Sequence, residues 1–154
     1  MTPYEVFISY AHEDRALLME LKAHIRILQW LNLISTWHDS DISAGGDWEQ
    51  HTMLHLNSAQ IILLLVSADF MNSDFCYSVE MQQAIQRHDA DQARVIPIIL
   101  RPVYWRGAPF EKLYVLPSEA LPVTKWPTRD DAFENVTHGI VNAIEDLQKK
   151  SKGP

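Results

Sequence analysis

The sequence predicts an α/β fold in which a five-stranded parallel sheet carries helices on both faces. Five short β-rich stretches alternate with helical patterns along the 154 residues, as expected for repeated βαβ units. The central stretches are aliphatic without interruption, which is typical of strands buried on both faces. We expect the strand order 2-1-3-4-5, the flavodoxin-like arrangement, whose switch point lies between the first and third strands.

The first part of the chain predicts a strand, a helix and a second strand. Residues 4–9 are β-rich and precede a polar loop at residues 10–14. From Arg15 to about Leu31, leucine and isoleucine recur at three- and four-residue steps, which predicts a helix with one buried face. Residues 33–37 predict the second, short strand.

A long loop at residues 38–47 precedes the second predicted helix. Asp47 is followed three residues later by Gln50, and this pair resembles a capping box. We therefore expect a helix from Trp48 to about Ser58.

The middle of the chain predicts two more strands with a helix between them. Residues 60–66 carry an unbroken aliphatic run, which predicts a fully buried strand. The chain then turns through small and polar residues and predicts a helix that continues to about Arg87. Residues 94–100 predict the fourth strand, and Pro97 within it indicates an interruption or an edge position.

The last part of the chain predicts irregular structure, a short strand and a long helix. Residues 101–118 are rich in proline, glycine and aromatic residues, so we expect few regular elements there. Residues 120–123 predict the fifth strand. Thr128 with Asp131 predicts the start of the final helix, whose apolar residues recur at helical spacing.

The composition fits one globular domain with a sizeable core. The chain is 47% hydrophobic, and we expect a single domain over residues 1–147. The polar, basic tail at residues 148–154 predicts the start of a linker to another domain. The formal net charge of −7 argues against nucleic acid as a partner.

Cysteine content and hydropathy predict a cytoplasmic protein that does not bind a membrane. The single cysteine excludes an internal disulfide framework and agrees with a reducing compartment. The longest apolar run, at residues 61–66, is far too short to span a bilayer. The first residues lack the basic region and apolar core of a signal peptide.

Residues 67–80 form the candidate functional stretch. Cys76 and Glu80 are four residues apart, so a helix would place them on one face. That helix follows the third strand and begins at the predicted switch point, where α/β sheets hold their ligands. The loop after the first strand, at residues 10–14, would meet it there.

Four stretches in order resemble the sequence boxes of Toll/interleukin-1 receptor (TIR) domains of the kind common in bacteria. The resemblance covers about residues 4–147. Residues 7–14 (Phe-Ile-Ser-Tyr-Ala-His-Glu-Asp) resemble the first box, and residues 37–48 resemble the strand and mobile loop that follow the first helix. Residues 67–80 resemble the segment with the catalytic glutamate of the family, and residues 95–100 resemble its fourth strand.

The resemblance implies an NAD+ glycohydrolase, which breaks the bond between nicotinamide and ribose and leaves ADP-ribose or a cyclic form of it. It implies Glu80 as the catalytic residue. Many active members carry Trp where this chain has Cys76, so Trp48 or Tyr77 would have to stack on the nicotinamide instead. The resemblance also implies self-association with other TIR domains, including into filaments, and a role in immune signalling or antiphage defence.

A single glutamate suits this reaction. Nicotinamide leaves as a neutral base, so no general acid is needed, and one carboxylate can stabilise the oxocarbenium-like ribose. The resemblance implies NAD+ as the substrate, and we expect no cofactor and no metal. Loop N–H groups near residues 9–12 and the charge of Arg15 would bind the pyrophosphate, whereas Asp39, Asp41 and Trp48 would line the nicotinamide end. The residues expected to bind substrate are Ser9, Tyr10, His12, Arg15, Asp39, Asp41, Trp48, Cys76 and Tyr77.

Three other interpretations compete with this one. A TIR domain can serve as a non-catalytic adaptor that assembles through the loop at residues 38–47 and the neighbouring helices. A phosphoacceptor receiver shares the strand order, and Glu13, Asp14, Asp69 and Lys125 superficially match its acidic pocket and lysine. His51 and His55 have the i,i+4 spacing of metal ligands, but no zinc signature surrounds them.

Overall fold

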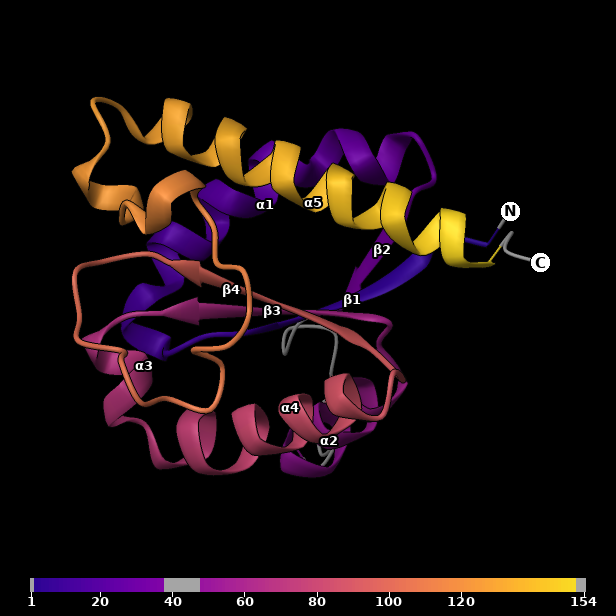
Figure 1. The fold of residues 1–154 in the computed structure, drawn as a ribbon, viewed down its shortest axis with the longest axis horizontal. Coiled ribbons are helices and arrows are strands. Elements are labelled where there is room, and N and C mark those ends of the chain that lie inside the picture. Colours follow the sequence, from indigo (N-terminus) through magenta and orange to yellow (C-terminus); the bar gives the residue numbers. More distant parts are fainter. Residues whose placement is uncertain (1, 38–47, 152–154) are drawn as a thin grey trace.

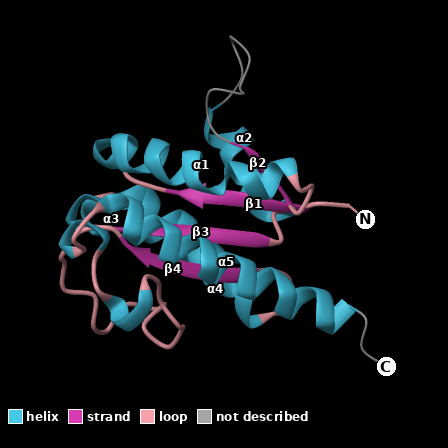
Figure 2. Cartoon of the chain, turned by 90° about the horizontal axis from the view of Figure 1, so that it is seen from above, coloured by secondary structure: helices cyan, strands magenta, loops and turns pink. Residues whose placement is uncertain are grey.

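The fold is described from a computed structural model, which describes residues 2–37 and 48–151. Its sheet consists of β1 (Tyr4–Ser9), β2 (Ile34–Trp37), β3 (Ile61–Val66) and β4 (Arg94–Ile99). All three pairings are parallel and the order is β2-β1-β3-β4. The α/β class and the flavodoxin-like order of the first four strands are therefore confirmed. Both views show β1, β3 and β4 pointing toward the same end of the molecule, where α3 lies (Figure 1, Figure 2).

The predicted fifth strand at residues 120–123 is wrong. In the described part of the chain the sheet has four strands, and the place beside β4 holds only an isolated parallel bridge between Ile98 and Leu116. Beyond that bridge, Glu119 and Ala120 adopt left-handed backbone angles, with φ of 61° and 57°. These angles are incompatible with an extended strand, and the segment forms 3-10 turns instead.

Pro97 confirms the predicted edge position. At the start of β4 the N–H of Arg94 donates to the carbonyl of Gln60, immediately before β3, at 2.9 Å. The N–H groups of Val95 and Ile99 face away from β3. That of Val95 donates to Nδ1 of His88 at 3.1 Å, and that of Ile99 donates to the carbonyl of Leu116 at 2.8 Å. Pro97 lies between these two outward-facing residues, so its missing N–H removes no bond from the β3–β4 ladder.

Helices cover both faces of the sheet (Figure 1). On one face lie α1 (Arg15–Trp30) and α5 (Arg129–Ser151). On the other lie α2 (Trp48–Ser58), α3 (Ala68–Asn72) and α4 (Met81–Asp89). Alternate side chains of each central strand enter one or the other of two buried apolar clusters, as expected for a parallel sheet covered on both sides.

The helices bear out the sequence patterns with one exception. The helices predicted from Arg15 and from Trp48 start there, and the hydroxyl of Thr128 accepts the N–H of Asp131 at 3.0 Å, as an N-cap does. The helix predicted after β3 is divided. It consists of α3, a π-helical segment at Asp74–Glu80, and α4.

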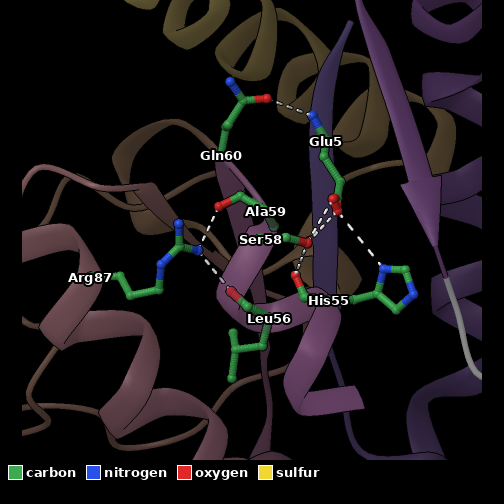
Figure 3. Close-up of polar contacts among 7 residues, drawn as sticks. All are labelled: Glu5, His55, Leu56, Ser58, Ala59, Gln60 and Arg87. Carbon is green, nitrogen blue, oxygen red and sulfur yellow. Dashed lines mark hydrogen bonds and ion pairs between the residues drawn. The ribbon is translucent and has the colours of Figure 1, made fainter. Parts of the chain in front are cut away.

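Arg87 fixes the end of the sheet at which the strands begin (Figure 3). It is 8% exposed, and its guanidinium donates to the carbonyls of Leu56 and Ala59 at 2.7 and 2.5 Å and of Gln92 at 3.1 Å. The carbonyl of Leu56 lies in the last turn of α2, where a helix leaves acceptors unsatisfied, and that of Ala59 directly follows the helix. Arg87 thus ties α4 to α2 and to the turn before β4.

Glu5 adds a second tie at the same end (Figure 3). Its carboxylate accepts the hydroxyl of Ser58 at 2.7 Å, and its N–H donates to the side chain of Gln60 at 3.1 Å. His55 lies 3.8 Å from the same carboxylate. These side-chain contacts join elements of the scaffold to one another, so they serve stability and leave the opposite end for function.

Replacing Arg87 with Met is expected to lower the free energy of unfolding by about 2–4 kcal/mol, because buried carbonyls lose charge-assisted donors. Urea denaturation measures this change. The control is Arg106→Met, since Arg106 is 68% exposed and lies 3.8 Å from Glu111; it should change stability by about 0.5 kcal/mol or less. Equal effects of the two substitutions would contradict this role for Arg87.

Candidate active site

A cavity of about 380 Å³ opens at the carboxyl ends of β1 and β3. This is the switch point of the sheet, where the order of strands reverses direction. The lining comes from β1 and the loop after it, from α2, and from the segment between β3 and α4. The polar and reactive residues among the lining are Tyr10, His12, Glu13, Thr52, Asp69, Asn72, Ser73, Cys76 and Glu80.

Glu80 is the buried carboxylate of this cavity. It is 4% exposed, and the hydroxyl of Ser9 donates to its Oε1 at 2.9 Å. Burial raises the pKa of Glu80 to about 7, although the hydrogen bond from Ser9 acts in the opposite direction. Near neutral pH the side chain therefore exists in both protonation states, as in groups that enzymes tune for chemistry.

Cys76 anchors the loop after β1. It is 5% exposed, and its thiol lies 3.2 Å from the carbonyl oxygen of Tyr10. Burial, together with the nearby charge of Glu80, raises the pKa of Cys76 to about 12. The thiol thus stays protonated at physiological pH, which excludes a thiolate nucleophile and leaves a packing and hydrogen-bonding role.

Two serine caps shape the segment that carries Glu80. The hydroxyl of Ser67 accepts the N–H of Phe70 at 3.1 Å at the start of α3, and that of Ser73 accepts the N–H of Cys76 at 3.1 Å at the start of the π-helical segment. Such caps set where each helical turn begins. Single π-turns occur frequently at functional sites, and here one ends at Glu80.

Arg101 is a residue that the sequence analysis missed. Its Nε donates at 2.9 Å to Asp14, which is 2% exposed, and its Nη2 donates to Asp69. The hydroxyl of Ser67 also donates to Asp14. Arg101 therefore joins the segments that follow β1, β3 and β4 at the rim of the cavity. An arginine immediately after a buried strand, at the carboxyl edge, was the signal in the sequence.

This network also bears on the receiver and metal interpretations. Asp14 and Asp69 do lie near one another, but each pairs with Arg101. Lys125 is exposed in a 3-10 turn. Within residues 2–37 and 48–151, no three His, Cys, Asp or Glu side chains gather in a way that would hold a metal ion.

The structure places the expected substrate-binding residues unequally. Tyr10, His12 and Cys76 line the cavity with Glu80, and Ser9 contacts Glu80. Arg15 is exposed at the start of α1, outside the lining. Tyr77 packs against the apolar cluster on the α2–α4 face and does not line the cavity. Asp39 and Asp41 lie outside the described residues, as does the side chain of Trp48.

Fold and site together define a doubly wound α/β domain with a buried carboxylate at its switch point. A family model described as "TIR domain" matches residues 6–136. The chain belongs to the TIR domain family.

The chain is similar to two known proteins, one in sequence and one in fold. The chain is 44% identical over 149 residues to the uncharacterized protein y4lF of Sinorhizobium fredii; the match covers 97% of this chain and 46% of that protein. The chain thus spans under half the length of this curated relative. It is also similar to the crystal structure of the TIR domain of the Toll-related receptor TRR-2 from Hydra magnipapillata, with a TM-score of 0.58, 22% identity, and coverage of 73% of this chain and 82% of that one. This second likeness shows the fold alone.

None of the helices in the described ranges combines the length and the apolar character that crossing a membrane requires.

Proposed function

We propose that this TIR domain is an NAD+ glycohydrolase that cleaves the bond between nicotinamide and ribose. One observation carries the proposal: Glu80, which the resemblance implies as the catalytic residue, is buried in a cavity of about 380 Å³ and accepts a hydrogen bond from Ser9. This volume falls in the usual range for small-molecule sites, about 300–1,000 Å³.

The charge of the cavity suits a cationic group. Glu13, Asp69 and Glu80 line it, with Asp69 paired to Arg101, and His12 is the one basic side chain among the described lining residues. The nicotinamide ring of NAD+ is positively charged, and the ribose carbon beside it gains positive charge as the bond breaks. The nicotinamide–ribose end would therefore enter the cavity, with the pyrophosphate outside it near the loop after β1.

The reaction needs little from the protein besides one carboxylate. The ring nitrogen takes the bonding electron pair, and nicotinamide leaves as a neutral molecule. Ionised Glu80 stabilises the oxocarbenium-like ribose. A water oxygen, or the adenine of the same molecule for a cyclic product, then bonds to the anomeric carbon. When water attacks, its proton passes to Glu80 or to solvent, and ADP-ribose remains.

The biological setting is part of the same proposal. TIR domains self-associate, and assembly of this one with other TIR domains, including into filaments, would activate the cleavage. Loss or conversion of NAD+ would then serve immune signalling or antiphage defence.

Purified protein at high concentration should release nicotinamide from NAD+, and Glu80→Ala protein should release almost none. Chromatography of the reaction mixture measures nicotinamide and identifies the remaining nucleotide as linear or cyclic. Equal rates for the two proteins would contradict the proposal. Rates per molecule that do not depend on protein concentration would contradict activation by assembly.

A non-catalytic adaptor is the second candidate, and exposed apolar side chains favour it. Near the C-terminal end of α1, Ile27, Trp30 and Leu31 are 52%, 73% and 60% exposed. Exposed apolar groups that gather in one region are typical of protein-interaction surfaces. No nicotinamide release at any concentration, with another TIR domain retained in a pull-down, would favour the adaptor.

A further inference from the structure

Thr52 is a buried polar residue of the cavity that the mechanism above does not use. It lies in α2 and is 3% exposed. It lines the same cavity as Glu80. Its hydroxyl oxygen is closed off from solvent and has no hydrogen-bond partner in the structure described.

A buried hydroxyl without a partner is unusual. The large majority of buried polar side-chain atoms are hydrogen-bonded, and one that is not needs an explanation. A threonine within a helix often donates to the carbonyl four residues earlier, as Thr137 does to Phe133 at 2.8 Å. Among the described residues Thr52 has no such bond, so its hydroxyl keeps an unused donor and acceptor beside the cavity.

We propose that Thr52 contacts the substrate and that its hydroxyl completes its hydrogen bonding with the nicotinamide–ribose half of NAD+. This inference rests on the proposed function. Glu80 must lie beside the anomeric carbon for the reaction to proceed, and Thr52 shares its cavity. The groups attached nearest to that carbon are the ribose hydroxyls and the carboxamide of the ring.

The chemistry of a threonine hydroxyl matches these groups. It offers one donor and two acceptor lone pairs, and both a ribose hydroxyl and a carboxamide offer a donor and an acceptor. Threonine in helices populates two rotamers about its Cα–Cβ bond. Rotation from its closed-off position to the other rotamer would turn the hydroxyl toward a bound ligand while α2 stays in place.

Thr52→Val tests the inference, because valine keeps the shape and the β-branch and removes the hydroxyl. The KM for NAD+ should rise about tenfold with kcat changed by about twofold or less, since the contact binds substrate and does not act on the reacting bond. The matched control is Thr52→Ser, which keeps the hydroxyl and should hold KM within about threefold of the unsubstituted protein. Unchanged KM in Thr52→Val protein would overturn the inference.

Thermal unfolding without substrate gives a second, independent readout. Because the hydroxyl has no partner within residues 2–37 and 48–151, Thr52→Val should raise the Tm by about 3 °C or more. A lower Tm would show that the hydroxyl has a structural partner in the free protein, and this would also overturn the inference. A purely structural threonine would not combine a higher Tm with weaker substrate binding.

The two proposals fail in different ways. If the unsubstituted and Glu80→Ala proteins release nicotinamide equally, the proposed function fails. If the unsubstituted protein is active and Thr52→Val matches it in KM, only the role of Thr52 fails. An NAD+ analogue with a 3-acetylpyridine ring tests a contact with the amide N–H group, because the acetyl group keeps the carbonyl and lacks the N–H. The effect of Thr52→Val should vanish on this analogue if Thr52 accepts from the amide N–H group, and should persist if it binds the ring carbonyl or a ribose hydroxyl.

Discussion

Nicotinamide release is expected to rise about thirtyfold between about pH 5.5 and about pH 8, and to fall by about 10³-fold in Glu80→Gln protein. The rise follows from the raised pKa of Glu80, about 7, because only the ionised carboxylate stabilises a positively charged ribose. Glutamine fills the same space without the charge. The residual activity of the Glu80→Gln protein should therefore be low and nearly independent of pH over the same interval.

The Ser9→Ala substitution supplies the matched control for this pH profile. The hydroxyl of Ser9 donates to Glu80 and lowers its pKa against the effect of burial. Without it the pKa of Glu80 should be higher, so the midpoint of the activity rise should move to higher pH. Initial rates at saturating NAD+ across the pH range measure both effects. A profile in the unsubstituted protein that falls with pH would contradict ionised Glu80 as the active form.

The strands were predictable because burial on both faces leaves a plain mark on the sequence. The aliphatic run at residues 61–66 became β3, in which every residue is buried. Pro97 correctly indicated an edge, because proline is tolerated only where no ladder N–H is needed. Hydrophobic patterning could not show that the predicted fifth strand was wrong, because the left-handed backbone angles of Glu119 and Ala120 prevent it from forming.

The candidate site was only partly predictable for a related physical reason. The sequence motif identified Glu80, and the predicted switch point identified the loop at residues 10–14 as its neighbour. The π-helical turn that ends at Glu80 has no sequence pattern of its own, because spacing alone does not distinguish it from an α-helix. Arg101 and Thr52 became visible only through long-range geometry. Arg101 joins three segments at the rim of the cavity. The hydroxyl of Thr52 has no partner among the described residues, which only the folded chain reveals.

Glu80 should also make the stability of the protein depend on pH, in the direction opposite to that of activity. The pKa of Glu80 is raised from 4.5 to about 7 in the folded protein. Below about pH 4.5 the carboxyl is protonated in both folded and unfolded chains and costs nothing. As pH rises, the unfolded chain ionises first, and the folded state loses stability until Glu80 ionises too, at about pH 7. Above that pH the full cost remains, on the order of 3 kcal/mol.

Glu80→Gln protein should therefore be more stable than the unsubstituted protein at about pH 8, by roughly 2–3 kcal/mol or a Tm higher by roughly 4–12 °C. The difference should shrink to near zero by about pH 4.5, because glutamine does not ionise and the other groups titrate equally in both proteins. Scanning calorimetry at a series of pH values measures it, and Glu145→Gln, at an exposed position of α5, should show no such trend. If Glu80→Gln is instead less stable at pH 8, the bond from Ser9 outweighs the cost of burying the charge. A gain in stability from the substitution that removes activity would mean that the fold carries a buried charge at the expense of its own stability, as expected where catalysis requires a carboxylate at that place.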